Sequence, residues 1–128
     1  MQDTDPRRRL GALGERLARG HLEARGLTVL DANFRTQHGE LDLVAADDRC
    51  FVFCEVKTRV LVGPPGELGP FAAIGTHKRR RVRLMAREWL AQRADSEPWR
   101  PELRFDAIGV ELDPRGRLIR LEHLEGAF

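Results

Sequence analysis

The 128-residue sequence contains no tyrosine, two tryptophans and two cysteines, and its longest apolar run, at residues 50–54, is five residues long. A membrane-spanning helix needs about 20 apolar residues, so a transmembrane segment is excluded. The charged N-terminus does not fit a secretory signal, and a cytoplasmic location is expected. With 33% charged and 41% hydrophobic residues, the composition predicts one soluble globular domain over residues 1–128.

The two cysteines, Cys50 and Cys54, lie four residues apart in a segment that predicts a strand. An extended chain separates them by about 13 Å, at about 3.3 Å per residue, which is too far for a disulfide. The four histidines are scattered, and none stands at metal-ligand spacing from a cysteine. We therefore expect buried, reduced thiols and no zinc site.

Lysine is also scarce, because only Lys57 and Lys78 accompany the arginines among the 22 cationic residues. The formal net charge of +2 is too small to indicate nucleic-acid binding by itself. A guanidinium cannot replace a compact, deprotonatable ammonium group. A lysine in a chain that otherwise uses arginine is therefore a candidate for a chemical role.

Hydrophobic spacing and turn residues predict an alternation of helices and strands. Helices are expected over residues 6–25 and 77–93, strands over 27–30, 40–45, 51–59, 103–112 and 118–124, and a polar turn over 33–39. Residues 60–75 contain four glycines and three prolines and predict a long irregular loop, and residues 1–6 are expected to be flexible. This order predicts an α/β domain with a central mixed β-sheet flanked by helices.

Both predicted helices carry an apolar stripe that should face the core. In the first helix the stripe is Leu10, Leu13, Leu17, His21 and Ala24, flanked by Gly11, Gly14, Ala18 and Leu22. In the second helix it is Val82, Met85, Ala86, Trp89 and Leu90. Basic residues fill the first three turns of the second helix, which is typical of a solvated face but also suits contact with a phosphate backbone.

The strands at 40–45 and 51–59 predict a hairpin that carries acidic residues on both strands. A four-residue loop gives the register pairs Ala46–Phe51, Asp42–Glu55 and Glu40–Lys57. Alternation along the second strand sets Glu55 and Lys57 on one side of the sheet. Two carboxylates and an ammonium group are therefore expected to converge.

Such a group of acids predicts a metal site, because neighbouring buried carboxylates repel each other unless a cation joins them. Mg²⁺ or Mn²⁺ is expected, since these ions take hard oxygen ligands. Asp42 and Glu55 would hold the ion, and the backbone carbonyl of Val56 would add a ligand. Lys57 would orient or deprotonate the attacking water.

The same residues have a simpler interpretation as exposed ion pairs, and Glu15 on the first helix could pair with Arg19 four residues later. The apolar residues around Glu55 favour a buried central strand, in which solvated charges are not expected.

Residues 39–43 (GELDL) and 53–59 (FCEVKTR) resemble the PD-(D/E)-x-K nuclease signature, with Leu41 where the wider signature often has proline. Nearly the whole chain is similar to the YraN family of small bacterial proteins. The further segments that carry this resemblance are residues 11–15 (GALGE), the helix of Lys78, residues 104–106 (RFD) and the C-terminal AF. The resemblance implies a restriction-endonuclease-like fold. Asp42, Glu55 and Lys57 match its catalytic Asp, Glu and Lys, and Glu15 matches its helix acid. Asp106 either supports the site or caps a strand.

The expected function is Mg²⁺-dependent hydrolysis of DNA phosphodiester bonds, with Glu15 as a further ligand or a support of the ligands. The residues expected to contact nucleic acid are Lys78, Arg79, Arg81 and Arg59. Fold analogy favours a homodimer, and no membrane partner is expected. Two alternatives stay open, namely a non-catalytic nucleic-acid-binding or scaffold protein, and a metal-dependent hydrolase of another substrate.

Overall fold

The structure is a computed structural model that describes residues 5–64 and 77–128, and the side chains of residues 77–79 are not described. Most of the loop predicted over residues 60–75, and residues 1–4 of the predicted flexible N-terminus, therefore lie outside the described residues. The elements in chain order are α1 (Pro6–Ala24), β1 (Thr28–Thr36), β2 (Gly39–Ala46), β3 (Cys50–Val60), α2 (His77–Arg93), β4 (Glu102–Leu112) and β5 (Leu118–Leu124).

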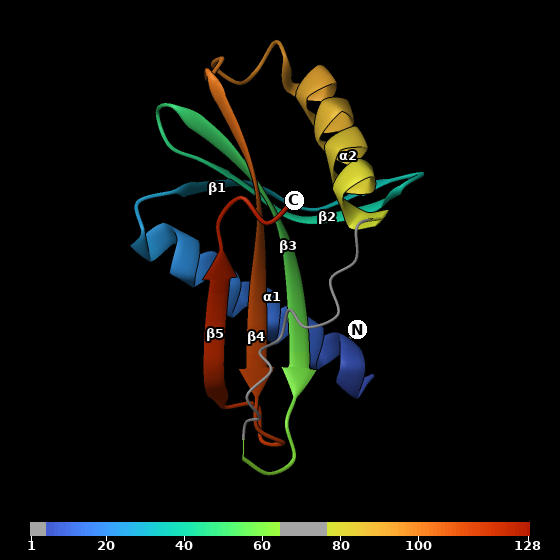
Figure 1. The fold of residues 1–128 in the computed structure, drawn as a ribbon, viewed down its shortest axis with the longest axis vertical. Coiled ribbons are helices and arrows are strands. Elements are labelled where there is room, and N and C mark those ends of the chain that lie inside the picture. Colours follow the sequence, from blue (N-terminus) through green and yellow to red (C-terminus); the bar gives the residue numbers. More distant parts are fainter. Residues whose placement is uncertain (1–4, 65–76) are drawn as a thin grey trace.

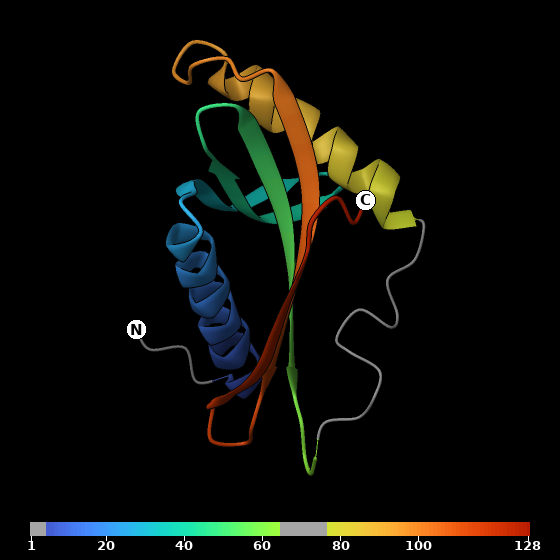
Figure 2. The same cartoon turned by 60° about the vertical axis from the view of Figure 1, so that its left-hand side comes forward.

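The five strands form one sheet in the order β1-β2-β3-β4-β5, in which β3 and β4 are parallel and the other neighbours are antiparallel. Helix α1 packs against one face of this sheet and α2 against the other (Figures 1 and 2). The expected α/β architecture with a flanked mixed sheet is confirmed. Strand β3 lies at the centre of the sheet, so the hairpin that carries the candidate residues is internal.

The face under α2 is filled by aromatic side chains, and the indole ring of Trp89 meets the rings of Phe51 and Phe53 edge-on. Val82, Met85 and Ala86 of α2 are buried in the same cluster, so the predicted apolar stripe of this helix faces the core. Burial of large aromatic side chains is a major source of stability in a domain of this size.

Helix α1 packs through a line of residues beside the leucine stripe that we expected, and two of its three members are small. Gly14, Ala18 and Leu22 are its buried residues, whereas Leu10, Leu13 and Leu17 pack beside them and stay partly exposed. The helix approaches β3 closely, because a Cβ atom at Gly14 would lie 1.9 Å from Oγ1 of Thr58. A helix can lie this close to a strand only where it has no side chain.

Strand β1 is longer than expected, and the predicted turn over residues 33–39 is wrong. The strand continues to Thr36, and only Gln37 and His38 form the turn before β2. Polar residues are tolerated here because β1 is an edge strand with solvent beside it. Asn33 has a left-handed φ of 54°, next to a shift of register between Val29 and Asp31.

The two cysteines are buried and free, as expected. Burial raises the pKa of the Cys54 thiol far above its ordinary value. In the described parts of the chain, no helix is both long and apolar enough to cross a membrane.

Candidate metal centre

The hairpin between β2 and β3 has the predicted register as far as its ladder extends. The paired residues are Ala46–Phe51, Ala45–Val52, Val44–Phe53 and Leu43–Cys54. Beyond Leu43 the ladder ends, so the expected pairs Asp42–Glu55 and Glu40–Lys57 do not form. Past this point β2 stays paired with β1, at Glu40–Arg35, and β3 stays paired with β4.

Asp42 is the first residue beyond this fork in the sheet. Its carboxylate turns toward β3 and accepts a 2.7 Å hydrogen bond on Oδ2 from the backbone N–H of Val56. The side chain thus replaces the ladder bond that the strands no longer make, and it remains close to the strand that carries Glu55 and Lys57.

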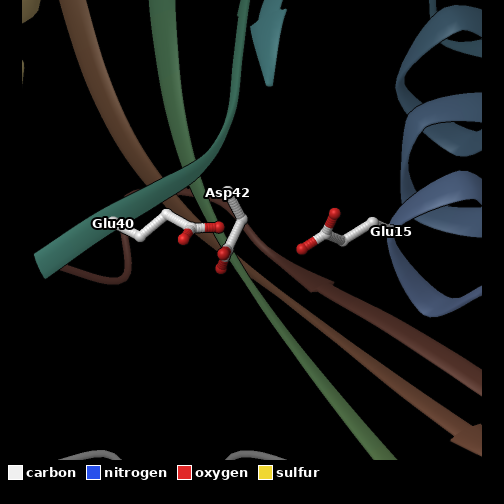
Figure 3. A group of neighbouring side chains, drawn as sticks. All are labelled: Glu15, Glu40 and Asp42. Carbon is white, nitrogen blue, oxygen red and sulfur yellow. The ribbon is translucent and has the colours of Figure 1, made fainter. Parts of the chain in front are cut away.

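Three half-buried carboxylates meet at this fork (Figure 3). Glu15, Glu40 and Asp42 each offer one carboxylate oxygen, and these atoms all lie within 4.8 Å of one another. Helix α1 supplies Glu15, and β2 supplies the other two. Glu40 also pairs with the exposed Arg35, at 3.3 Å.

Glu40 was not expected among the ligands, because the predicted register set it opposite Lys57. The signal that could have identified Glu40 is its position two residues before Asp42, since residues two apart on a strand point to the same side. Once β2 separates from β3, Glu40 and Asp42 face α1 together.

The carboxylates at this fork repel one another when they are ionised. Burial raises the pKa of Asp42 to about 7, the Val56 N–H opposes this rise, and the neighbouring Glu15, Glu55 and Glu40 add to it. Burial also raises the pKa of Glu15, although a hydrogen bond from the Asn33 side chain acts in the other direction. Like charges at this separation would be relieved by a cation.

Glu55 and Lys57 lie on β3 beyond the end of its ladder with β2, and alternation sets them on the side of the strand opposite to Thr58, which packs against α1. Glu55 is half-buried, its Oε2 atom is inaccessible to solvent, and its charge contributes to the raised pKa of Asp42. Lys57 is exposed and lies two residues further on the same side of the strand. Glu55 is not one of the three acids whose oxygens lie within 4.8 Å of one another.

Asn33 is a site residue that the sequence analysis missed, because its segment was expected to be a turn. It is exposed, has the left-handed φ of 54°, and donates a hydrogen bond to Glu15. Asparagine adopts this conformation more readily than most residues do. A cavity of about 220 Å³ opens beside this pair, lined also by Arg16, Arg19 and Leu43. Arg19, the ion-pair partner considered for Glu15, lies 3.8 Å from the carboxylate of Glu23 instead.

The four basic residues expected to bind nucleic acid differ in their positions. Arg81 is exposed, and its Cδ atom would lie 3.7 Å from a Cβ at Gly39, beside the start of β2. Arg59 donates to the buried carboxylate of Glu111. The side chains of Lys78 and Arg79 lie outside the described residues.

Asp106 belongs to a separate buried network. Its carboxylate accepts hydrogen bonds from Arg104 and from the backbone N–H of Gly126, and it lies 2.7 Å from Nε2 of His123. His123 in turn lies 3.0 Å from His21 of α1. Asp106 therefore ties α1 to β4 and β5, on elements other than those that carry the three acids.

The mixed sheet between two helices, with acids at a fork beside a central strand, is consistent with a nuclease-like fold. Residues 14–110 match the model of the family described as "Uncharacterised protein family UPF0102". The chain belongs to this family, and the resemblance to the YraN family is thereby confirmed.

Relatives of similar length support this membership. A UPF0102 protein of Frankia alni is 44% identical over 122 residues, which cover 93% of each chain. A UPF0102 protein of Beutenbergia cavernae is 44% identical over 119 residues, covering 91% of this chain and 93% of its own. One from Mycobacterium tuberculosis is 42% identical over 127 residues, covering 96% and 94% respectively.

Proposed function

We propose that this protein is a divalent-metal-dependent endonuclease that hydrolyses DNA phosphodiester bonds. The observation that carries the proposal is the meeting of Glu15, Glu40 and Asp42, whose carboxylate oxygens lie within 4.8 Å of one another. The exposed Lys57 on the adjacent central strand supplies the cationic group that such a reaction needs.

The chemistry of the donor set fits Mg²⁺ or Mn²⁺. The three groups are carboxylates, which are the hard oxygen ligands that these ions prefer, and neither a thiolate nor an imidazole belongs to the cluster. Burial raises the pKa of Asp42 to about 7 and the neighbouring carboxylates add to the rise, so a cation at this position would relieve an unfavourable charge. Glu15, Glu40 and Asp42 would hold the ion, with Glu55 and the Val56 carbonyl as the ligands that we propose from β3.

The bound ion would polarise a phosphoryl oxygen and lower the pKa of the attacking water. Lys57 would orient that water and offset the negative charge that develops on the phosphate. Because its side chain is exposed, it can reach a substrate that docks from solvent. Asn33 would hold the Glu15 carboxylate toward β2 through its hydrogen bond.

DNA is the proposed substrate because arginines surround the acids. Arg81 lies beside Gly39 at the start of β2, and Arg16 and Arg19 line the cavity next to Glu15. Guanidinium groups at these positions suit a phosphate backbone, which they contact without reading sequence. With no tyrosine and two tryptophans in the chain, stacking on single-stranded bases has few candidate residues.

The test is a cleavage assay with duplex, branched and single-stranded DNA, and with RNA, in Mg²⁺ and in Mn²⁺. We expect cleavage of DNA by the wild-type protein and a loss of at least about 10²-fold in Asp42→Asn. Asp48→Asn, which changes an exposed acid in the β2–β3 turn, serves as the matched control and should cleave normally. Binding of DNA without cleavage would favour the non-catalytic alternative, and cleavage of RNA alone would favour another hydrolase.

A further inference from the structure

Strand β5 is the edge strand that exposes apolar side chains. It pairs with β4 on one side, and in the described parts of the chain no strand pairs with its other side. Leu118, Ile119 and Leu124 are 48%, 37% and 44% exposed, and they are three of the seven large apolar residues exposed in those parts. Unpaired backbone groups beside exposed apolar side chains are a template for the addition of another strand.

The sequence of this edge is complementary to itself. Residues 117–125 read Arg-Leu-Ile-Arg-Leu-Glu-His-Leu-Glu, with basic residues before Leu121 and acidic residues after it. Antiparallel pairing of two copies about Leu121 gives the cross-strand pairs Arg117–Glu125, Leu118–Leu124, Ile119–His123 and Arg120–Glu122. Every acidic residue then lies opposite an arginine, and the two exposed leucines lie opposite each other.

Arg120 already lies between two acids of its own chain, because it also contacts the buried carboxylate of Glu111 on β4. Arg120 and Glu122 lie on one side of the sheet, with Nε of Arg120 3.7 Å from Oε1 of Glu122. Both side chains stay partly exposed, at 27% and 37%. Charges on an edge strand commonly prevent pairing, but here a second copy would meet each charge with one of opposite sign.

We propose that two copies of this chain associate through antiparallel pairing of their β5 strands, which joins the two sheets into one. The symmetry axis of such a pairing is perpendicular to the sheet, so both copies present the same face to the same side. The two β3 strands would stand five strand spacings apart, roughly 24 Å. This proposal is independent of the proposed nuclease activity.

Two double variants test both the surface and its register. Leu118→Lys with Leu124→Glu introduces opposite charges that face each other across the proposed interface, and Leu118→Lys with Leu124→Lys introduces like charges. Within one chain, the two positions are about 20 Å apart along the strand and do not contact each other. Any difference in association between the two variants must therefore arise between molecules.

Sedimentation equilibrium over a range of protein concentrations is the measurement. We expect the wild-type protein to dimerise, and the variant with opposite charges to associate at least about tenfold more tightly than the variant with like charges. Leu84→Lys, a matched change of an exposed leucine on α2, should leave the dimer unchanged. At protein concentrations low enough for both double variants to be monomeric, their thermal midpoints should agree, because both positions are exposed.

The proposal would be overturned by a wild-type protein that stays monomeric at every concentration. Equal association of the two double variants would overturn it as well. A dimer that both double variants leave intact would mean that the copies meet through another surface.

Discussion

Gly14 of α1 lies against Thr58 of β3 so closely that a Cβ on the glycine would be 1.9 Å from the threonine Oγ1. This contact fixes the distance between the helix and the central strand, and the next residue on the helix is Glu15. The packing of a small residue thus determines whether Glu15 can reach the acids on β2.

Gly14→Ala should therefore destabilise the fold. The added methyl group would overlap Thr58, which belongs to a central strand and cannot move away, and overpacking of this kind costs about 1–3 kcal/mol. Gly11→Ala on the same helix is the control, because a Cβ there meets nothing within 4 Å. It should stabilise the helix by up to about 1 kcal/mol. Urea denaturation checks both values, and equal effects would contradict the close contact.

Asp42→Asn should stabilise the metal-free protein at high pH. The unfolded aspartate titrates near its ordinary pKa of 3.8, whereas the folded one titrates at about 7, so the free energy of unfolding falls as pH rises between these values. The asparagine side chain carries no charge and can still accept the bond from Val56. We expect the variant to be more stable than the wild type by about 2–4 kcal/mol at pH 8, with the difference vanishing near pH 4.

Thermal midpoints in a chelating buffer across pH 4–8 check this prediction. Added Mn²⁺ should raise the midpoint of the wild type at pH 8 and leave that of Asp42→Asn nearly unchanged. A difference that is independent of pH would contradict the raised pKa.

The sequence predicts local features of this site well. The four-residue connection determines the register of β2 against β3 as far as Leu43, and the predicted pair Ala46–Phe51 is confirmed. The fork after Leu43 could not be predicted, because both segments continue as strands beyond it. The neighbour of β2 there, strand β1, was expected to end at residue 30 but continues to Thr36. That strand contains polar residues and a left-handed Asn33, which in sequence indicate a turn.

The predicted buried face of α1 was wrong for a different reason. Helical spacing identifies the apolar stripe but not the distance at which the helix packs. Because Gly14 packs closely against Thr58, the buried residues of α1 are those in line with Gly14 and not those in line with Leu13.

Asn33→Gly should weaken metal binding without unfolding the protein. Glycine adopts the left-handed φ of 54° freely but cannot donate the side-chain hydrogen bond to Glu15. We expect several-fold lower Mn²⁺ affinity by calorimetry and an unchanged thermal midpoint. Asn33→Ala should show the same loss of affinity with about 1 kcal/mol of added strain. Unchanged affinity in both variants would show that Glu15 does not depend on Asn33.

Arg59→Ala should lower the stability of the fold, whereas Arg81→Ala should weaken DNA binding. Arg59 bonds to Glu111, whose buried carboxylate keeps a pKa below its ordinary value because the bonds from Arg59 and Arg120 outweigh its burial. Loss of Arg59 should cost about 1–2 kcal/mol, moderated by the remaining Arg120 and by solvent. Arg81 is exposed, so its loss should leave stability unchanged and weaken DNA binding, with a smaller salt dependence. Fluorescence anisotropy measures DNA binding and urea denaturation measures stability. A loss of stability in Arg81→Ala but not in Arg59→Ala would contradict these two roles.

Lys57→Arg tests whether the exposed ammonium takes part in the reaction. If Lys57 only formed ion pairs on a solvated strand, arginine would serve equally well, because it keeps the charge and pairs readily with carboxylates. If it orients or deprotonates the attacking water, arginine should fail, since guanidinium is bulkier and stays protonated throughout the working range. We expect a loss of roughly 10² to 10⁴ in cleavage rate, and a change in stability within about 0.5 kcal/mol because the side chain is exposed. The two quantities must be measured on the same preparations at fixed Mg²⁺ and salt. Equal cleavage rates in the two proteins would remove Lys57 from the mechanism.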